Sequence, residues 1–352
     1  MTKQFKLTAF AAITALSVSF GALAAQADEI RVLNWKGYGT DEDWALKAFT
    51  EKTGHTVTHD YFNSEQEMLT KMRTNPGAYD VVLINSAYTK QAKDEGLIEK
   101  IDTADMPNVK DLAPNMAGNP DLAPNGETYG VAWVWGLTSF AVNKNDVTPM
   151  PDSIQVLWDE KYKGKVGWRD DAVESVYFGA IATGQKISDI KDLDAVKEKL
   201  AKLLPQIKTF WSSENDWNQF FAAGDFVMAP YWSGSAGRSM SKGLPVEFVV
   251  PKEGAIAWLD GLSIPKGSKH PEAARAFINY MISPDFNVEW AGKGAPAPAN
   301  SKVAEKLPED DLNRSVLGDP EVVARVQFMA PLSEDKRKEY LELWQELKAT
   351  SQ

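Results

Sequence analysis

The first hundred residues alternate short apolar segments with longer amphipathic ones, and this alternation narrows the folds open to the chain. Residues 30–35 (IRVLNW), 55–62 (HTVTHDYF) and 79–85 (YDVVLIN) have the composition of strands. The segment after each has apolar residues at helical spacing. In the first of these segments, Thr40 is placed to cap a helix and Gly54 to end it. Strand–helix–strand alternation predicts an α/β fold with a parallel sheet covered by helices.

Two long extended segments, near residues 135–142 and 252–262, interrupt this alternation. Further predicted strands and helices lie between and after them. Two such hinge crossings divide a chain into two lobes built from discontinuous sequence. A ligand of such sheets binds beyond the carboxyl ends of the strands, which here means between the lobes. The predicted lobes are residues 28–137 with 259–315 (lobe 1) and residues 138–258 with 316–352 (lobe 2).

Residues 1–27 have the pattern of a cleaved export signal. Lys3 and Lys6 precede an apolar stretch, and Ala25-Gln26-Ala27 gives the small-residue cleavage pattern. We therefore expect a mature chain in the periplasm. No later stretch reaches the roughly 20 apolar residues that span a bilayer. The chain has no cysteine, which excludes disulfides, a thiolate nucleophile, a cysteine-ligated metal and a lipid-anchored cysteine.

The chain is acidic, with 49 Asp and Glu against 38 Lys and Arg and a formal net charge of −11. This balance disfavours a nucleic-acid partner. A negative field would also concentrate cationic ligands, but solubility alone explains the net charge better. No Gly-x-Ser-x-Gly elbow or phosphate loop occurs. His55 and His59 share a face of a predicted strand, but no third metal ligand is evident. We predict a binding protein rather than an enzyme, with no catalytic residue, cofactor or metal.

Three tryptophans differ from those expected in the core. Trp35, Trp232 and Trp258 each end an apolar strand beside small or polar residues, in NWKGY, YWSGS and AWLDG. Strand ends beside glycine place side chains at a cleft rim. Asp260, two residues after Trp258 on an extended segment, points to the same side as that indole. A carboxylate beside an aromatic face is what an ammonium group requires.

A second acidic pair has two interpretations. Asp171 and Glu174, in WRDDAVESVYFG, lie three residues apart where a strand passes into a helix. This spacing places both carboxylates on one face of the first turn. It is also the spacing of a capping box, with Asp171 as the N-cap. A third possibility is a periplasmic glycosidase, in which Asp171 works with Asp260 or Glu174.

Several motifs in order along the chain resemble the periplasmic polyamine-binding proteins of spermidine/putrescine ABC importers. The resemblance implies the two-lobed type II periplasmic binding protein fold, a monomer that closes on its ligand by hinge motion, and delivery to a membrane permease. The motifs cover nearly the whole mature chain, and the segment around residues 251–260 is the most specific. They are LNWKGY, GAYDVVLINSAY, LWDEKYKGKV, DDAVESVY, YWSGSA, PKEGAIAWLDGLSIPKGS and EAARAFINYMISPD.

The resemblance also implies a set of ligand contacts. These comprise aromatic residues near the ligand, an acidic pair for an ammonium group, an acid near a crossing, and polar residues on neighbouring loops. The residues at the matching positions are Trp35, Tyr38, Ser86, Tyr88, Asp171, Glu174, Trp232, Trp258, Asp260 and Gln327.

The chain departs from this family at four positions. Lys36 and Gly37 stand where many spermidine binders have a small hydroxyl residue and an acid, Arg169 replaces a small polar residue, and Ala295 replaces an aromatic one. An ammonium close to either cation would be repelled by about 1–4 kcal/mol. Two ligands therefore stay open. One is a linear di- or polyamine between the tryptophans. The other is a zwitterionic ω-amino acid such as 4-aminobutyrate, with its carboxylate on Lys36 or Arg169.

Overall fold

The computed structural model describes residues 27–350 apart from residues 310 and 317. The predicted export signal lies outside the described residues except for its last position. Among the helices of the described part, none combines the length and apolar character needed to cross a bilayer.

The N-terminal segment has the predicted order of elements. Strands β2 and β3 both pair in parallel with β1, through Ile30↔Val57 and Val32↔Val81. The strand–helix alternation read from the sequence is therefore confirmed. The elements are β1 (Glu29–Asn34), α1 (Asp43–Thr53), β2 (Thr56–Tyr61), α2 (Glu65–Thr74), β3 (Val81–Asn85) and α3 (Ser86–Asp94).

Only the C-terminal end of α1 lies where the sequence predicts it. Gly54 ends the helix with a φ of 81°, as predicted. The predicted cap at Thr40 is wrong, because α1 begins at Asp43 and its N-cap residue is Glu42. Thr40 is buried, and its Oγ1 instead accepts a 2.8 Å hydrogen bond from Asn34 Nδ2.

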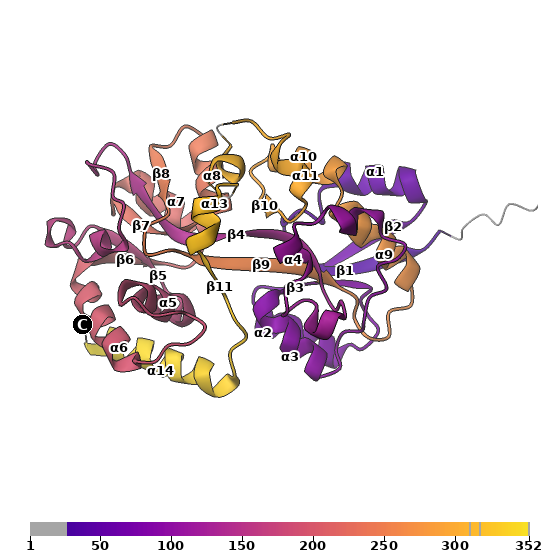
Figure 1. Cartoon of the computed structure of the whole chain (residues 1–352), viewed down its shortest axis with the longest axis horizontal. Coiled ribbons are helices and arrows are strands. Elements are labelled where there is room, and N and C mark those ends of the chain that lie inside the picture. The colour runs from indigo at the N-terminus through magenta and orange to yellow at the C-terminus, as the bar shows by residue number, and fades with distance from the viewer. Residues whose placement is uncertain (1–26, 310, 317, 351–352) are drawn as a thin grey trace, which may run out of the picture.

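Two long strands, β4 (Val131–Asn143) and β9 (Ile256–Ser263), form the middle of the sheet. They pair antiparallel with each other. Strand β9 also pairs with β3 through its C-terminal half, and β4 pairs with β7 through its C-terminal half. The strand order is β2-β1-β3-β9-β4-β7-β5-β6. Figure 1 shows the two strands running between the two halves of the molecule, as the prediction of two hinge crossings requires.

The second half of the sheet has its own strands and covering helices. They are β5 (Val166–Arg169), α5 (Ala172–Ala182), α6 (Leu193–Leu203), β6 (Ile207–Trp211), α7 (Glu214–Ala223), β7 (Met228–Trp232), α8 (Ser233–Ser241), β8 (Val246–Val249) and α14 (Glu334–Thr350). The remaining elements are α4 (Pro114–Ala117), α9 (Pro271–Met281), α10 (Pro284–Ala291), β10 (Ala297–Pro298), α11 (Ser301–Ala304), α12 (Leu312–Ser315), α13 (Pro320–Arg325) and β11 (Gln327–Phe328).

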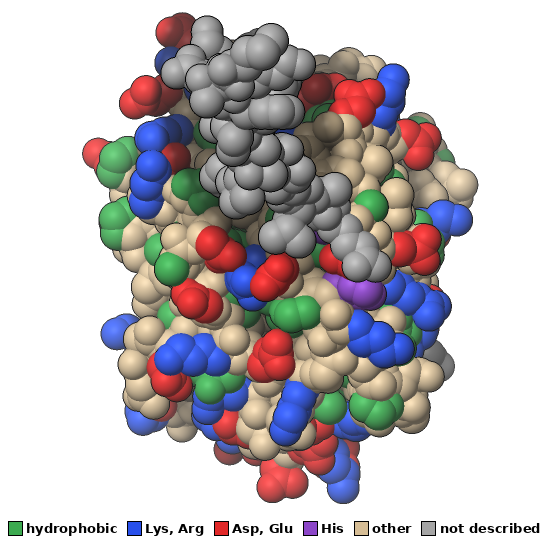
Figure 2. All heavy atoms as spheres, turned by 90° about the vertical axis from the view of Figure 1, so that its right-hand side faces the viewer, with side chains coloured by type: hydrophobic (Ala, Val, Ile, Leu, Met, Phe, Trp, Pro, Cys, Tyr) green, Lys and Arg blue, Asp and Glu red, His purple; other side chains and the backbone are tan. Residues whose placement is uncertain are grey.

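Helices cover both faces of the sheet in each half (Figure 1). In the half that contains β1, helices α2 and α3 lie on one face and α1 and α9 on the other. In the half that contains β5, helices α5, α6 and α14 lie opposite α7 and α8. The end of the molecule nearest β1 and β2 has acidic and basic side chains interspersed, with scattered hydrophobic ones (Figure 2). Such a mixed surface is typical of a solvent-exposed face rather than of an apolar interaction surface.

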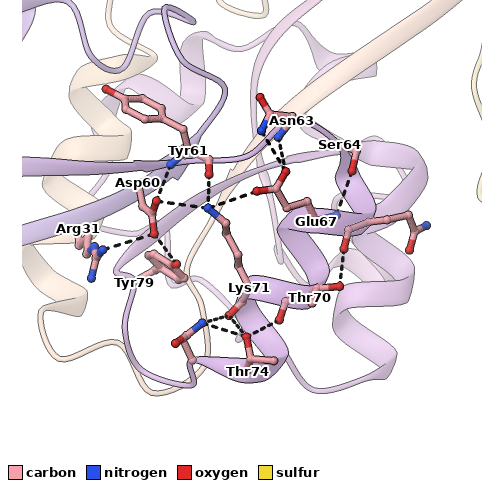
Figure 3. A network of polar contacts seen from close by, with 12 residues as sticks. Arg31, Asp60, Tyr61, Asn63, Ser64, Glu67, Thr70, Lys71, Thr74 and Tyr79 are labelled. Atoms are coloured by element: carbon pink, nitrogen blue, oxygen red, sulfur yellow. Dashed lines mark hydrogen bonds and ion pairs between the residues drawn. The ribbon is translucent and has the colours of Figure 1, made fainter.

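A polar network fixes α2 against the edge of the sheet (Figure 3). Lys71, on α2, donates to the backbone oxygen of Tyr61 and lies 3.4 Å from both Asp60 Oδ1 and Glu67 Oε1. Tyr79 Oη donates to Asp60 Oδ2 at 2.8 Å. These contacts tie α2 to β2 and to the start of β3, and so determine where the first residue of α2 lies.

The loop after β1 contains two glycines in the left-handed backbone conformation. They differ in the space around them, so replacing each by alanine separates backbone strain from a clash of side chains. Gly37 has φ of +73° and open space around it, whereas a Cβ at Gly39 (φ +77°) would lie 2.5 Å from the Trp290 ring. We expect Gly37→Ala to lower the free energy of unfolding by about 1 kcal/mol through backbone strain. Gly39→Ala should lower it by about 2–4 kcal/mol, because the indole must also move. Urea unfolding of both variants measures the difference, and equal losses would contradict it.

Candidate ligand-binding site

The loop after β1 presents Tyr38 to the middle of the sheet. Asn34 Nδ2 donates to the Tyr38 backbone oxygen at 3.0 Å and holds the loop closed. The Tyr38 ring makes edge-to-face contacts with Trp133 and Trp290, at centroid distances of 5.7 and 5.8 Å. Its hydroxyl donates to Asp260 Oδ2 at 2.9 Å. Two residues 222 positions apart in sequence are thus in direct contact.

Asp260 lies on β9 directly opposite Asn85 of β3 and is 7% exposed. Asn85 Nδ2 donates to its Oδ1 at 2.9 Å. Burial, together with the charge of Glu65, raises the pKa of Asp260 to about 7, although the bonds from Tyr38 and Asn85 oppose that rise. Both hydrogen-bonding partners are neutral. The carboxylate therefore has a strong electrostatic preference for an added cation.

Of the capping box predicted for the acidic pair after β5, the structure shows the N-cap half, since the Glu174 side chain contacts Arg169 instead of the N-cap backbone. Asp171 is the N-cap of α5, and its Oδ1 accepts from the Glu174 backbone N–H at 2.9 Å. Glu174 is 8% exposed. Its Oε1 lies 2.5 Å from Arg169 Nη1, while its Oε2 is buried without a hydrogen-bond partner among the described residues. Burial and the charge of Asp171 raise the pKa of Glu174, and Arg169 and a hydrogen bond from Trp232 oppose this rise.

Arg169 ends β5 and Trp232 ends β7, and the two side chains meet. The Arg169 Cζ lies 4.7 Å from the centroid of the Trp232 ring, within the range of a cation–π contact. Its Nη2 also lies 3.8 Å from Asp171 Oδ2. Arg169 is only partly exposed. The aromatic and acidic groups predicted from the sequence are thus brought together around a cation that belongs to the protein.

Glu65, which sequence reasoning missed, is the first residue of α2. Burial raises the pKa of Glu65; Asp171 adds to this rise, and Arg169 and Arg337 oppose it. Glu65 therefore belongs to the same group of charges as the acidic pair, although it comes from the other half of the sheet. The sequence pattern Ser64-x-x-Glu67 is that of a helix start and accounts for the acids of this turn without a ligand.

Arg337, on α14, is a second residue that sequence reasoning missed. Its Nη1 donates to Tyr88 Oη at 2.6 Å, and its Cζ lies 4.0 Å from the centroid of the Tyr88 ring. Burial and the charge of Glu65 raise the pKa of Tyr88 to about 12, against the effect of Arg337. This contact joins α14 to α3 over 249 positions of sequence. A position that distant has no local sequence pattern that could have indicated it.

The other predicted residues lie around or away from these charges. Trp35 packs edge-on against Phe62 at 4.6 Å, and Ser86 is buried at the start of α3. The prediction that Trp258 ends a strand is wrong, because Trp258 is the third residue of β9. A Cβ on the neighbouring Gly136 would come within 2.4 Å of its indole. Trp258 Nε1 is buried and has no hydrogen-bond partner in the described part of the chain.

Lys36 and Gln327 are not brought into the charged group. Lys36 is exposed, and its Nζ lies 6.0 Å from the centroid of the Tyr61 ring. Gln327 Oε1 accepts a 2.9 Å hydrogen bond from the backbone of Ile187. Ala295 lines a cavity of about 670 Å³ beside α8 and α12, but none of the charged side chains described above lines that cavity. No cluster of three or more His, Asp or Glu suited to a metal ion occurs among the described residues.

Two halves joined by two long strands, with acids and aromatics on and beside those strands, have the architecture of two-lobed solute-binding proteins. Comparison with known proteins agrees. Residues 44–316 match the family of bacterial extracellular solute-binding proteins. The spermidine/putrescine-binding periplasmic protein of Salmonella typhimurium is 33% identical over 347 residues, which cover 96% of this chain and 97% of that protein.

Two further proteins extend the comparison. The putrescine-binding periplasmic protein SpuD of Pseudomonas aeruginosa is 25% identical, over 93% of this chain and 96% of its own. The crystal structure of the spermidine/putrescine ABC transporter substrate-binding protein PotD from Streptococcus pneumoniae has a TM-score of 0.84 at 24% identity. It covers 93% of this chain and all of that one. The chain belongs to the bacterial extracellular solute-binding proteins, in the family of the spermidine/putrescine-binding periplasmic proteins. The predicted type II binding-protein fold is confirmed.

The raised pKa of Asp260 predicts how stability depends on pH. Burial favours the neutral Asp260 carboxyl, which therefore adds to the free energy of unfolding at low pH. The ligand-free protein loses this stabilisation as the pH rises through about 7. Between about pH 5 and pH 8 the loss should amount to about 2 kcal/mol. Asp260→Asn keeps the shape and removes the titration. Urea unfolding should therefore show a smaller decline over this range in the variant than in the parent protein. Parallel pH profiles would contradict the assignment.

Proposed function

We propose that the protein is the periplasmic solute-binding component of an ABC importer and binds a polyamine, putrescine or spermidine, between its two lobes. The names of the relatives support this choice of importer and of ligand class. The observation that carries it is Asp260, a buried carboxylate whose two hydrogen-bonding partners are both neutral. An ammonium group would supply the missing charge and also contact the neighbouring aromatic rings.

The proposed contacts combine charge and aromatic surface. Asp260 would hold one ammonium, and the acids at the end of β5 would face another. The methylene chain would lie along Trp35, Trp232 and Trp258, where apolar carbon is best shielded from water. The proposed ligand-binding residues are Trp35, Tyr38, Glu65, Ser86, Tyr88, Asp171, Glu174, Trp232, Trp258, Asp260 and Gln327.

The mechanism follows from two lobes that share one ligand. We propose that residues 28–137 with 259–315 move as one body, and residues 138–258 with 316–352 as the other. A ligand that contacts both bodies shifts the protein toward a closed form, by as much as it binds that form more tightly. The closed form would then dock on the permease.

A second candidate ligand is a zwitterionic ω-amino acid such as 4-aminobutyrate. Arg337 favours it, because its Nε is buried without a hydrogen-bond partner in the described residues. A ligand carboxylate could occupy that position while its ammonium contacts Asp260. Arg337 suits this role better than the anchors named from the sequence, since Lys36 is exposed and Arg169 already pairs with two acids.

The glycosidase alternative has less support. The family is one of binding proteins rather than of enzymes. Asp171 is the N-cap of α5, and Glu174 pairs with Arg169, so both carboxylates have structural partners that account for them without catalysis.

Titration calorimetry on residues 28–352, refolded to remove any bound ligand, tests the function directly. We expect one-to-one binding of putrescine or spermidine, and weak or no binding of 4-aminobutyrate. Heat with 4-aminobutyrate alone would overturn the polyamine assignment in favour of the second candidate.

Glu65 offers a sharper test of where the amine lies. Glu65→Gln should weaken amine binding by about 1–3 kcal/mol, because one carboxylate near the ligand is lost. Glu67→Gln on the same helix is the control. Glu67 contacts Asn63 and Lys71 rather than the charged group, so amine affinity should hold. If both variants bind equally well by calorimetry, Glu65 does not face the ligand.

A further inference from the structure

Arg169 occupies a position that has the chemistry of an ammonium site. Its guanidinium contacts the Glu174 carboxylate at 2.5 Å, approaches Asp171 at 3.8 Å and lies over the Trp232 ring at 4.7 Å. Two carboxylates and one aromatic face are the groups that an alkylammonium ligand would also seek. We call these three residues, Asp171, Glu174 and Trp232, the acid–aromatic seat.

Arg169 leaves part of this seat unused. It pairs with Oε1 of Glu174, whereas Oε2 of the same carboxylate is buried and has no hydrogen-bond partner among the described residues. Glu65 lies near enough for its pKa to respond to Asp171 and Arg169. One ammonium can therefore still bind at this end, between Glu65 and Glu174. A second ammonium would meet the guanidinium as a like charge.

The count of charges in the site agrees with this limit. Four carboxylates belong to it, those of Glu65, Asp171, Glu174 and Asp260, and two guanidinium groups oppose them, those of Arg169 and Arg337. The fully ionised site thus has a formal charge of −2. A diamine neutralises that charge, while a triamine exceeds it.

We propose that Arg169 is a specificity-determining residue, an inference that rests on the proposed function. It fills the acid–aromatic seat with the protein's own cation and so restricts the ligand to a diamine such as putrescine, against a triamine such as spermidine. The diamine places one ammonium at Asp260 and the other between Glu65 and Glu174. Without Arg169 the seat is open to a third ammonium.

The test is titration calorimetry of putrescine and spermidine at about pH 8 with the wild-type protein and Arg169→Ser. The wild type should bind putrescine at least about tenfold more tightly than spermidine. Arg169→Ser should raise the affinity for spermidine at least about tenfold and reverse the preference. If the putrescine affinity persists and the spermidine affinity does not rise, the proposal is overturned.

Two further variants separate the seat from general effects. Arg169→Gln removes the charge but keeps a larger polar side chain than serine, so it tests the same outcome if Arg169→Ser fails to fold. Lys208→Ser removes a positive charge from an exposed residue of β6, the strand next to β5, and should leave the preference unchanged. A shift with Lys208→Ser as large as with Arg169→Gln would contradict a local seat. Failure of the wild type to bind either amine would instead overturn the proposed function itself.

Discussion

The antiparallel pairing of β4 with β9 is the interaction on which the rest of the molecule depends. It joins a parallel unit on one side to a second set of strands on the other, so that one sheet runs through both lobes. This register brings Trp258 beside Gly136, and the pairing of β9 with β3 sets Asp260 opposite Asn85. A shift of one residue would turn Asp260 to the other face. Asp260 and Trp258 therefore lie in the same strand pairings that connect the two halves of the sheet.

The site is stabilised only in part by its own contacts. Asp260 and Glu174 are both more than nine-tenths buried, and burial opposes their ionisation. Buried carboxyl groups without full compensation lower the stability of a fold. Asn85, Tyr38 and Arg169 offset some of this cost, but one oxygen of Glu174 stays unpaired among the described residues. Such incomplete compensation is typical of sites that a ligand completes.

Much of this architecture could be predicted from the sequence, because strand and helix periods are local. The parallel unit, the two crossings and the acids after β5 all follow from patterns within about ten residues. Thr40 was misassigned because a hydroxyl residue before an amphipathic run satisfies a cap pattern, whereas its actual partner is Asn34. Glu65 and Arg337 could not be predicted for a different reason. Their importance comes from charges contributed by other elements, and no periodicity encodes which helices face each other.

The positive charges of the second half of the sheet bear on how a ligand can drive closure. Arg169 and Arg337 come from β5 and α14, and both lower the pKa of Glu65, which comes from α2. The protein thus contains its own electrostatic attraction between the two halves. A ligand shifts an equilibrium only through its differential affinity for one state. Charge near Glu65 is already partly balanced, so a cationic ligand gains less there than at Asp260, whose described partners are neutral. Residues near Glu65 can then tune the discrimination between ligands, while residues near Asp260 tune the strength of binding.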